Sequence, residues 1–318
     1  MPMKRIPARV NAPNLADPKR ARLFVIVARD ARRAVVFRRG PTRKTRLFVW
    51  NLRDDTLEAG QWFFGRIYER RCDLSPDGEL LSYFAAKFVK PYGTWTAISR
   101  PPYFTALAFW PKGNSWGGGG LFEDARTFLL NHSQGEREIV ALQGTPGAHG
   151  IAVKPLGRYS GGGEDEPIYT ERLTRDGWSV NTPTEEKEQS FNAPVWIVFD
   201  PPRTRSLTLA GGGKQRPLTL RVLTHGYHEK NGRSWVETAD VLDHEGKVLR
   251  DFGRIDWIDK DHNGDILIAR EGRLERLRRG DIKAGAPRLV ADLHDMTFEP
   301  VEAPSWAQTW TKRRPVKR

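Results

Sequence analysis

Short runs of β-branched, aromatic and aliphatic residues, separated by polar turn residues, recur along most of this chain. Near the beginning, three such runs at residues 23–28, 34–37 and 47–52 predict a small meander of strands. The clearest series comes late, and its runs are residues 235–242, 248–252, 255–258, 266–269 and 274–277. Strands of this length with frequent turns between them are typical of an all-β protein.

Residues 65–88 contain the most distinct hairpin, with a turn at Ser75, Pro76, Asp77 and Gly78. Proline sets the backbone angle of the first central turn position, and glycine accepts the positive φ that closes the turn. Residues 257–267 repeat this order of apolar strand, polar turn ending in glycine, and apolar strand. Two related units far apart in the chain indicate a degenerate repeat.

The string Asp-Leu-Ser-Pro-Asp-Gly between two apolar strands resembles the inner hairpin of a β-propeller blade, as in WD40 and TolB-like proteins. This resemblance implies a β-propeller of five or six blades with degenerate repeats. We expect the propeller to occupy residues 21–304, between a basic extended arm at residues 1–20 and a basic tail at residues 305–318. The block Tyr-Glu-Arg-Arg-Cys-Asp-Leu-Ser-Pro-Asp-Gly also resembles a block shared by a group of uncharacterised bacterial proteins, and it implies no activity.

Composition agrees with many short strands and turns. The 318 residues include 30 Gly, 22 Pro, 15 Phe and 11 Trp. No apolar run approaches the roughly 18 to 20 residues that a membrane helix requires, so we expect no membrane span. The single cysteine, Cys72, has no partner for an internal disulfide, and the N-terminal residues lack the apolar stretch of a signal peptide. Both features favour the cytoplasm.

The formal net charge of +13 is concentrated at the two ends of the chain. Residues 1–46 carry 14 Lys and Arg against two acids, and residues 312–318 add five more basic residues, so the middle is slightly acidic. Clustered ends of this kind attract nucleic acid or an acidic partner, and Trp306 and Trp310 could stack on bases. Solvated tails are the simpler alternative. The candidate contact residues are Lys4, Arg5, Arg9, Lys19, Arg20, Lys312, Arg313 and Arg314.

Asp259, Asp261 and Asn263 precede Gly264 at alternating positions, as at the start of a calcium-binding loop. The later acidic ligand that such loops need is absent, because Leu267 and Arg270 occupy its expected positions. An ordinary hairpin turn therefore explains these residues better than a metal site.

His225 and His228 lie within five residues that end at Glu229, and zinc favours ligands of these types. Gly226 and the surrounding strand pattern favour a polar loop instead. The glycine-rich runs match neither a Walker loop nor a dinucleotide-binding fingerprint, because Gly213 and Lys214 are followed by Gln215. We therefore expect no metal and no cofactor.

No nucleophile motif identifies an enzyme, and whether the chain is one stays open, with a non-enzymatic role favoured. We predict a binding or scaffold propeller that presents loops, especially residues 141–194, to a protein partner. Two alternatives stand beside it. The first is a glycosidase-like propeller hydrolase with carboxylates at its channel, and the second is nucleic-acid binding through the joined basic ends. The channel candidates are Glu69, Asp73, Asp240 and Asp256.

Overall fold

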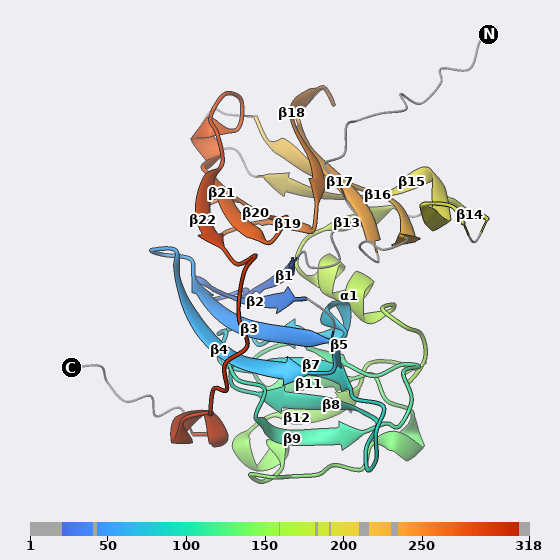
Figure 1. Ribbon diagram of the computed structural model, residues 1–318, viewed down its shortest axis with the longest axis vertical. Helices are drawn as coiled ribbons and strands as arrows, with labels where there is room; N and C mark the ends of the chain where they lie inside the picture. Colours follow the sequence, from blue (N-terminus) through green and yellow to red (C-terminus); the bar gives the residue numbers. More distant parts are fainter. Residues whose placement is uncertain are drawn as a thin grey trace.

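A computed structural model describes residues 21–40, 43–158, 160–181, 184–190, 192–209, 216–229 and 235–311. Within these ranges the protein consists mostly of β-strands and loops, and α1 (Ile168–Arg175) is the one α-helix. Five sheets follow one another along the described chain (Figure 1). The prediction of an all-β fold is confirmed, whereas a closed ring of five or six blades stays a prediction.

Most sheets are antiparallel meanders in which each strand pairs with the next one in the chain. The first sheet contains β1 (Arg22–Val27), β2 (Arg33–Arg39), β3 (Lys44–Asn51) and β4 (Thr56–Phe64). The second contains β5 (Arg66–Ile67), β6 (Asp73–Leu74), β7 (Leu81–Ala86), β8 (Thr94–Ser99) and β9 (Ala106–Pro111). The third contains β10 (Gly120–Phe122), β11 (Thr127–Leu130) and β12 (Ala152–Pro155), and β12 runs parallel to β11.

The fourth and fifth sheets form the C-terminal half. The fourth contains β13 (Ser179–Asn181), β14 (Glu185–Glu188), β15 (Val195–Leu209), β16 (Leu218–Glu229), β17 (Trp235–Leu242) and β18 (Val248–Ile255). The fifth contains β19 (Trp257–Lys260), β20 (Ile266–Arg270), β21 (Arg273–Leu277) and β22 (Arg288–Asp292). Short 3-10 turns are η1 (Glu69–Arg71), η2 (Gln134–Glu136), η3 (Pro146–His149), η4 (Arg279–Asp281) and η5 (Ser305–Gln308).

The first sheet lies between the second and the fifth. Its strand β1 contacts β6 on one side and β19 and β20 on the other. Four successive residues of β2, Ala34 to Phe37, are fully buried, because neighbouring sheets cover both faces. Further contacts join β10 to β6 and β18 to β20, and α1 touches both β10 and β13. The short helix therefore bridges the third and fourth sheets, as Figure 1 shows near the middle of the molecule.

The predicted turn of the hairpin at residues 65–88 is confirmed, but the prediction of its first strand is wrong. Gly78 has a φ of 71°, and its N–H donates to the Ser75 carbonyl oxygen at 2.8 Å. The expected strand before the turn is interrupted by η1 between β5 and β6. This interruption turns Arg70 and Arg71 toward neighbouring parts of the molecule, where both side chains are buried. The second hairpin closes similarly, since Gly264 N–H donates to the Asp261 carbonyl oxygen at 3.0 Å.

A buried carboxylate, Glu237 of β17, ties η1 to the fourth sheet. It accepts hydrogen bonds from Arg70 Nη2 at 3.0 Å and from Arg205 Nη1 at 2.7 Å. The Arg70 guanidinium lies 4.3 Å from the ring centre of Tyr169 and 4.1 Å from that of Trp235. Burial alone would raise the pKa of Glu237, but the charges of Arg205 and Arg70 outweigh it and lower the pKa to about 2. This cluster therefore keeps its charges at neutral pH.

Replacing Glu237 with Gln should lower the free energy of unfolding by about 3 to 5 kcal/mol, because two buried guanidinium groups lose their shared carboxylate. Urea denaturation of the wild type and the variant measures this loss. Lys187→Gln, which removes an exposed ion pair with Asp200, is the matched control and should leave the free energy of unfolding nearly unchanged. Equal losses in the two variants would show that the Glu237 cluster does not stabilise the fold.

Candidate functional site

The short segment from Glu69 to Asp73 contacts four separate parts of the molecule. Glu69 pairs with Arg39 of the first sheet at 2.5 Å. Arg71 Nη1 donates to the carbonyl oxygens of Ser115 and Gly117 at 2.6 and 2.7 Å. Together with the contact of Arg70 to Glu237, these bonds make the segment a junction between sheets.

Cys72 and Asp73 connect the same junction to α1. The Cys72 carbonyl accepts a hydrogen bond from Arg172, and the buried Asp73 carboxylate accepts from Arg175 at 2.6 and 3.0 Å. Asp73 also accepts from the backbone N–H of Phe122 at 2.7 Å. Burial raises the pKa of the Cys72 thiol, so this cysteine is not a ready nucleophile. The junction therefore fixes the position of α1 beside the inner strands.

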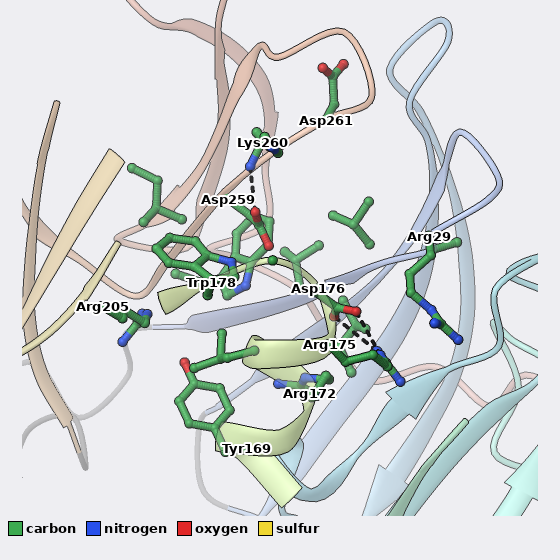
Figure 2. A pocket seen from close by; sticks show the side chains of 18 of the residues that line it. Arg29, Tyr169, Arg172, Arg175, Asp176, Trp178, Arg205, Asp259, Lys260 and Asp261 are labelled. Carbon is green, nitrogen blue, oxygen red and sulfur yellow. Dashed lines mark hydrogen bonds and ion pairs between the residues drawn. The ribbon is translucent and has the colours of Figure 1, made fainter. Parts of the chain in front are cut away.

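A cavity of about 400 Å³ lies next to this helix, between β1, α1 with the residues that follow it, and β19. Figure 2 shows the side chains that line it, and the Asp259 carboxyl is directed toward its interior beside Trp178. The chain reaches the cavity wall from three distant regions, residues 25–29, 169–178 and 257–262, and Arg205 of β15 adds a fourth contribution.

Three carboxylates line the cavity, and two of them have basic partners. Asp176 accepts hydrogen bonds from Arg175 at 2.8 and 3.0 Å. Asp261 pairs with Arg276. Asp259 accepts from its neighbour's backbone, Lys260 N–H, at 2.8 Å, and from the Trp178 side chain. Among the described residues, no basic side chain lies within ion-pair distance of the Asp259 carboxyl.

The environment of Asp259 disfavours its charge. Burial, with a smaller contribution from the nearby carboxylate of Asp176, raises its pKa to about 7. Burial also raises the pKa of Asp176, against the opposing effect of Arg175. A carboxyl that gains and loses its proton near pH 7 in a cavity is characteristic of a binding or catalytic site.

The basic side chains of the cavity are held by fixed acceptors. Arg29 Nη2 donates to the carbonyl oxygens of Phe122 and Glu123 at 3.0 and 2.9 Å. Lys260 Nζ donates to the Thr208 carbonyl at 3.0 Å. Arg172, Arg175 and Arg205 bind the groups described above. These cations therefore shape the cavity walls. The charges of Lys260 and Arg205 favour the charged form of Asp259, but neither side chain forms an ion pair with it.

The three weak candidates for a calcium loop, Asp259, Asp261 and Asn263, do not converge. Asp259 faces the cavity, whereas Asp261 Oδ1 accepts the backbone N–H groups of Asn263 and Asp265 at 2.8 and 3.0 Å. Asn263 Oδ1 accepts from Arg32 Nη2 at 3.0 Å. The segment is a hairpin turn whose oxygens already have hydrogen-bond partners.

His225 and His228, the weak candidates for zinc ligands, lie in β16, where a polar loop was expected. His225 Nε2 bonds to Thr238 Oγ1 at 2.9 Å, and burial lowers the pKa of His225. The His228 ring packs on Tyr227 and Trp196, with ring centres 4.8 and 5.5 Å apart. Nowhere in the described ranges do three His, Cys, Asp or Glu side chains gather as a metal site would require.

The four expected channel carboxylates lie outside the cavity lining. Asp73 pairs with Arg175, Glu69 with Arg39, and Asp240 with Arg221. Asp256 lines a separate cavity of about 50 Å³. Asp259, which lines the cavity beside α1, was a metal candidate in the sequence, but no sequence pattern indicated its environment.

Sequence reasoning also missed α1, which lies within the expected loop region at residues 141–194. Ile168, Tyr169 and Arg172 of this helix are buried. The spacing of Ile168, Tyr169, Arg172 and Leu173 matches one face of a helix and was the available signal. The helix forms because this face packs between two sheets.

The packed part of the chain extends past residue 304, where we expected the tail to begin. Trp306 packs on Tyr103 with ring centres 5.6 Å apart, and Trp310 is buried and stacked on His149. The buried Trp310 indole is therefore not displayed for stacking on bases, whereas Trp306 is half-buried. The candidate nucleic-acid contacts, Lys4, Arg5, Arg9, Lys19, Arg20, Lys312, Arg313 and Arg314, lie outside the described residues, and their role stays a prediction.

No helix of the described chain is long and apolar enough to cross a membrane. No family model and no curated protein sequence matches this chain. A variant of the AtxE2 isopeptidase with astexin3-dC4 bound is a similar solved structure, with 13% identity and a TM-score of 0.34. The alignment covers 92% of this chain and 54% of that chain, so this chain spans about half of its length.

A second similar structure is the β-propeller domain of the Trilobed protease from Pyrococcus furiosus, with 10% identity and a TM-score of 0.25. The alignment covers 86% of this chain and 97% of that one. The structures that resemble this chain thus include a β-propeller domain.

Replacing Asp259 with Asn should stabilise the protein, and more so at pH 8 than at pH 5. The folded pKa of about 7 lies above the unfolded value, so stability from the neutral carboxyl is lost as pH rises through 7. We expect the stability gap between variant and wild type to grow by about 1 to 3 kcal/mol between these pH values.

Urea denaturation at both pH values measures the gap. Asp295→Asn, at a side chain that is 99% exposed, is the matched control and should show no such growth. A variant at Asp259 that is no more stable than the wild type at pH 8 would contradict the described environment of this carboxyl.

Proposed function

We propose that this protein is a non-enzymatic binding module that takes a small ligand group into the cavity beside α1. The observation that carries the proposal is the Asp259 carboxyl, which faces a cavity without a basic partner. The cavity volume of about 400 Å³ falls within the usual range for small-molecule sites. Trp178, Trp257 and Tyr169 supply the apolar walls that such sites commonly have.

The protein partner expected from the sequence could also bind at this cavity. One wall comes from residues 169–178, within the 141–194 segment proposed to present loops to a partner. A partner that covers this region could insert a single side chain between α1 and β19. The ligand group is therefore part of a small molecule or the side chain of a bound protein.

A second candidate function is acid–base catalysis of a hydrolytic reaction. Its support is the presence of Asp176 and Asp259 on one cavity, each with a pKa raised by burial. The ion pair of Asp176 with Arg175 disfavours this reading, because it holds one of the two carboxyls in a structural role. A panel of chromogenic glycoside and ester substrates tests it, and turnover that Asp259→Asn removes would favour an enzyme over a binding module.

Filling the cavity should abolish ligand binding without unfolding the protein. Val27 lines the cavity from the end of β1 and is only partly buried, so Val27→Phe adds volume where space exists. We expect fragments that show saturation-transfer NMR signals with the wild type to lose most of that signal with the variant.

Val153→Phe is the matched control, because Val153 is 38% exposed on β12 and outside the cavity. It should retain the wild-type fragment signals. The proposal fails if no fragment binds the wild type, or if the bound fragments bind Val27→Phe equally well.

A further inference from the structure

One carboxyl group among the described residues that line the cavity has no ion-pair partner. The lining cations are bound to carbonyl oxygens or to carboxylates, and the lining carboxylates Asp176 and Asp261 have Arg175 and Arg276. Asp259 is the exception among the described residues of the lining. Asp259 is partly buried. A carboxylate withdrawn from water without a basic partner is unstable in its charged form, and an incoming cation removes this cost.

Trp178 holds the Asp259 carboxyl in place. The indole N–H donates to the carboxyl, and the indole itself is buried. The second anchor is Lys260 N–H, at 2.8 Å. Both donors come from the protein wall, so the carboxyl keeps acceptor capacity toward the cavity, where Figure 2 shows it directed.

We propose that the group bound in this cavity is a compact organic cation, an alkylammonium or alkylguanidinium, paired with Asp259. This inference rests on the proposed function and names the chemistry of its ligand. The walls formed by Trp178 and Trp257 would cover the alkyl part, while the charged end contacts the carboxyl. The same chemistry occurs in free amines and in lysine or arginine side chains of a protein partner.

An anionic ligand is the competing prediction. The Nε atoms of Arg29 and Arg205 are buried and have no hydrogen-bond partner. However, Arg29 Nη2 and both Nη atoms of Arg205 already bind protein oxygens. An anion would also meet the Asp259 carboxyl in the same cavity and would force it to stay neutral. A cation would pair with Asp259, the lining carboxyl without a basic partner. The charge distribution of the cavity therefore favours a cationic ligand.

Propylguanidinium and its neutral isostere propylurea test the charge of the ligand directly. Isothermal titration of the full-length protein at pH 8 should give at least tenfold tighter binding for propylguanidinium. Asp259→Asn should remove this preference, and Asp295→Asn should keep it. Equal binding of the two probes, or a preference that survives Asp259→Asn, would overturn the inference.

The pH dependence separates Asp259 from the other charged groups of the cavity. Propylguanidinium stays charged from pH 6 to 8. A carboxyl with a pKa of about 7 therefore predicts about tenfold weaker binding at pH 6 than at pH 8. Asp259→Asn should abolish this dependence, whereas a dependence that came from His262 would persist in the variant. The charged or titratable groups that line the cavity with Asp259 are Arg29, Tyr169, Arg172, Arg175, Asp176, Arg205, Lys260, Asp261 and His262.

Propionate and two larger cations complete the test. Tighter binding of propionate than of propylguanidinium would establish the anionic alternative and overturn the inference. Butylammonium and Nα-acetyl-lysine methylamide distinguish the sources of the cation. Tighter binding of the capped lysine supports a protein side chain, tighter or equal binding of butylammonium supports a free amine, and failure of both to bind overturns the inference.

Failure of this inference is distinguishable from failure of the proposed function. If neutral or anionic fragments bind the wild type and Val27→Phe blocks them, the cavity is a binding site with a different ligand. If no probe of any charge binds, the binding function itself is wrong.

Discussion

The buried Glu237 carboxylate, shared between Arg70 and Arg205, holds together parts of the chain that are distant in sequence. Arg70 comes from the junction between the first two sheets, and Arg205 and Glu237 come from the fourth sheet. Tyr169 of α1 packs against the Arg70 guanidinium, so the helix is part of the same cluster. Apolar clusters join the first sheet to the second and fifth sheets, and the fourth sheet to the fifth. The link from Arg70 to the fourth sheet is made by charged residues, whose geometry must be exact because burial of unpaired charge is costly.

The position of the cavity follows from this arrangement. Asp73 and the Cys72 carbonyl fix Arg175 and Arg172 of α1, and the helix then stands beside β1 and β19 with a space between them. The walls are rigid because their cations are bound to fixed acceptors. At neutral pH the charged form of the Asp259 carboxyl destabilises the folded protein, and the fold itself does not depend on this charge. A group that destabilises the folded state in a cavity is typical of a functional residue.

Local chemistry made the hairpins predictable from the sequence. The turns at residues 75–78 and 261–264 depend on proline, aspartate and glycine at adjacent positions, and both form as expected. The pairing of Arg70 with Glu237 spans 167 residues, and no local pattern indicates it. The break in the strand at η1 and the burial of α1 depend on such distant contacts, and so does the isolation of Asp259. The residue types of the site were visible in the sequence, but the charge balance around them was not.

The most direct test of this account is an NMR titration of the Asp259 carboxyl in the unliganded full-length protein, with selective ¹³C labelling of aspartate. The account predicts that this carboxyl titrates with a midpoint near pH 7, because it is withdrawn from water and lacks an ion-pair partner. A midpoint of about 4 or below, as for an ordinary exposed or ion-paired aspartate, would contradict it.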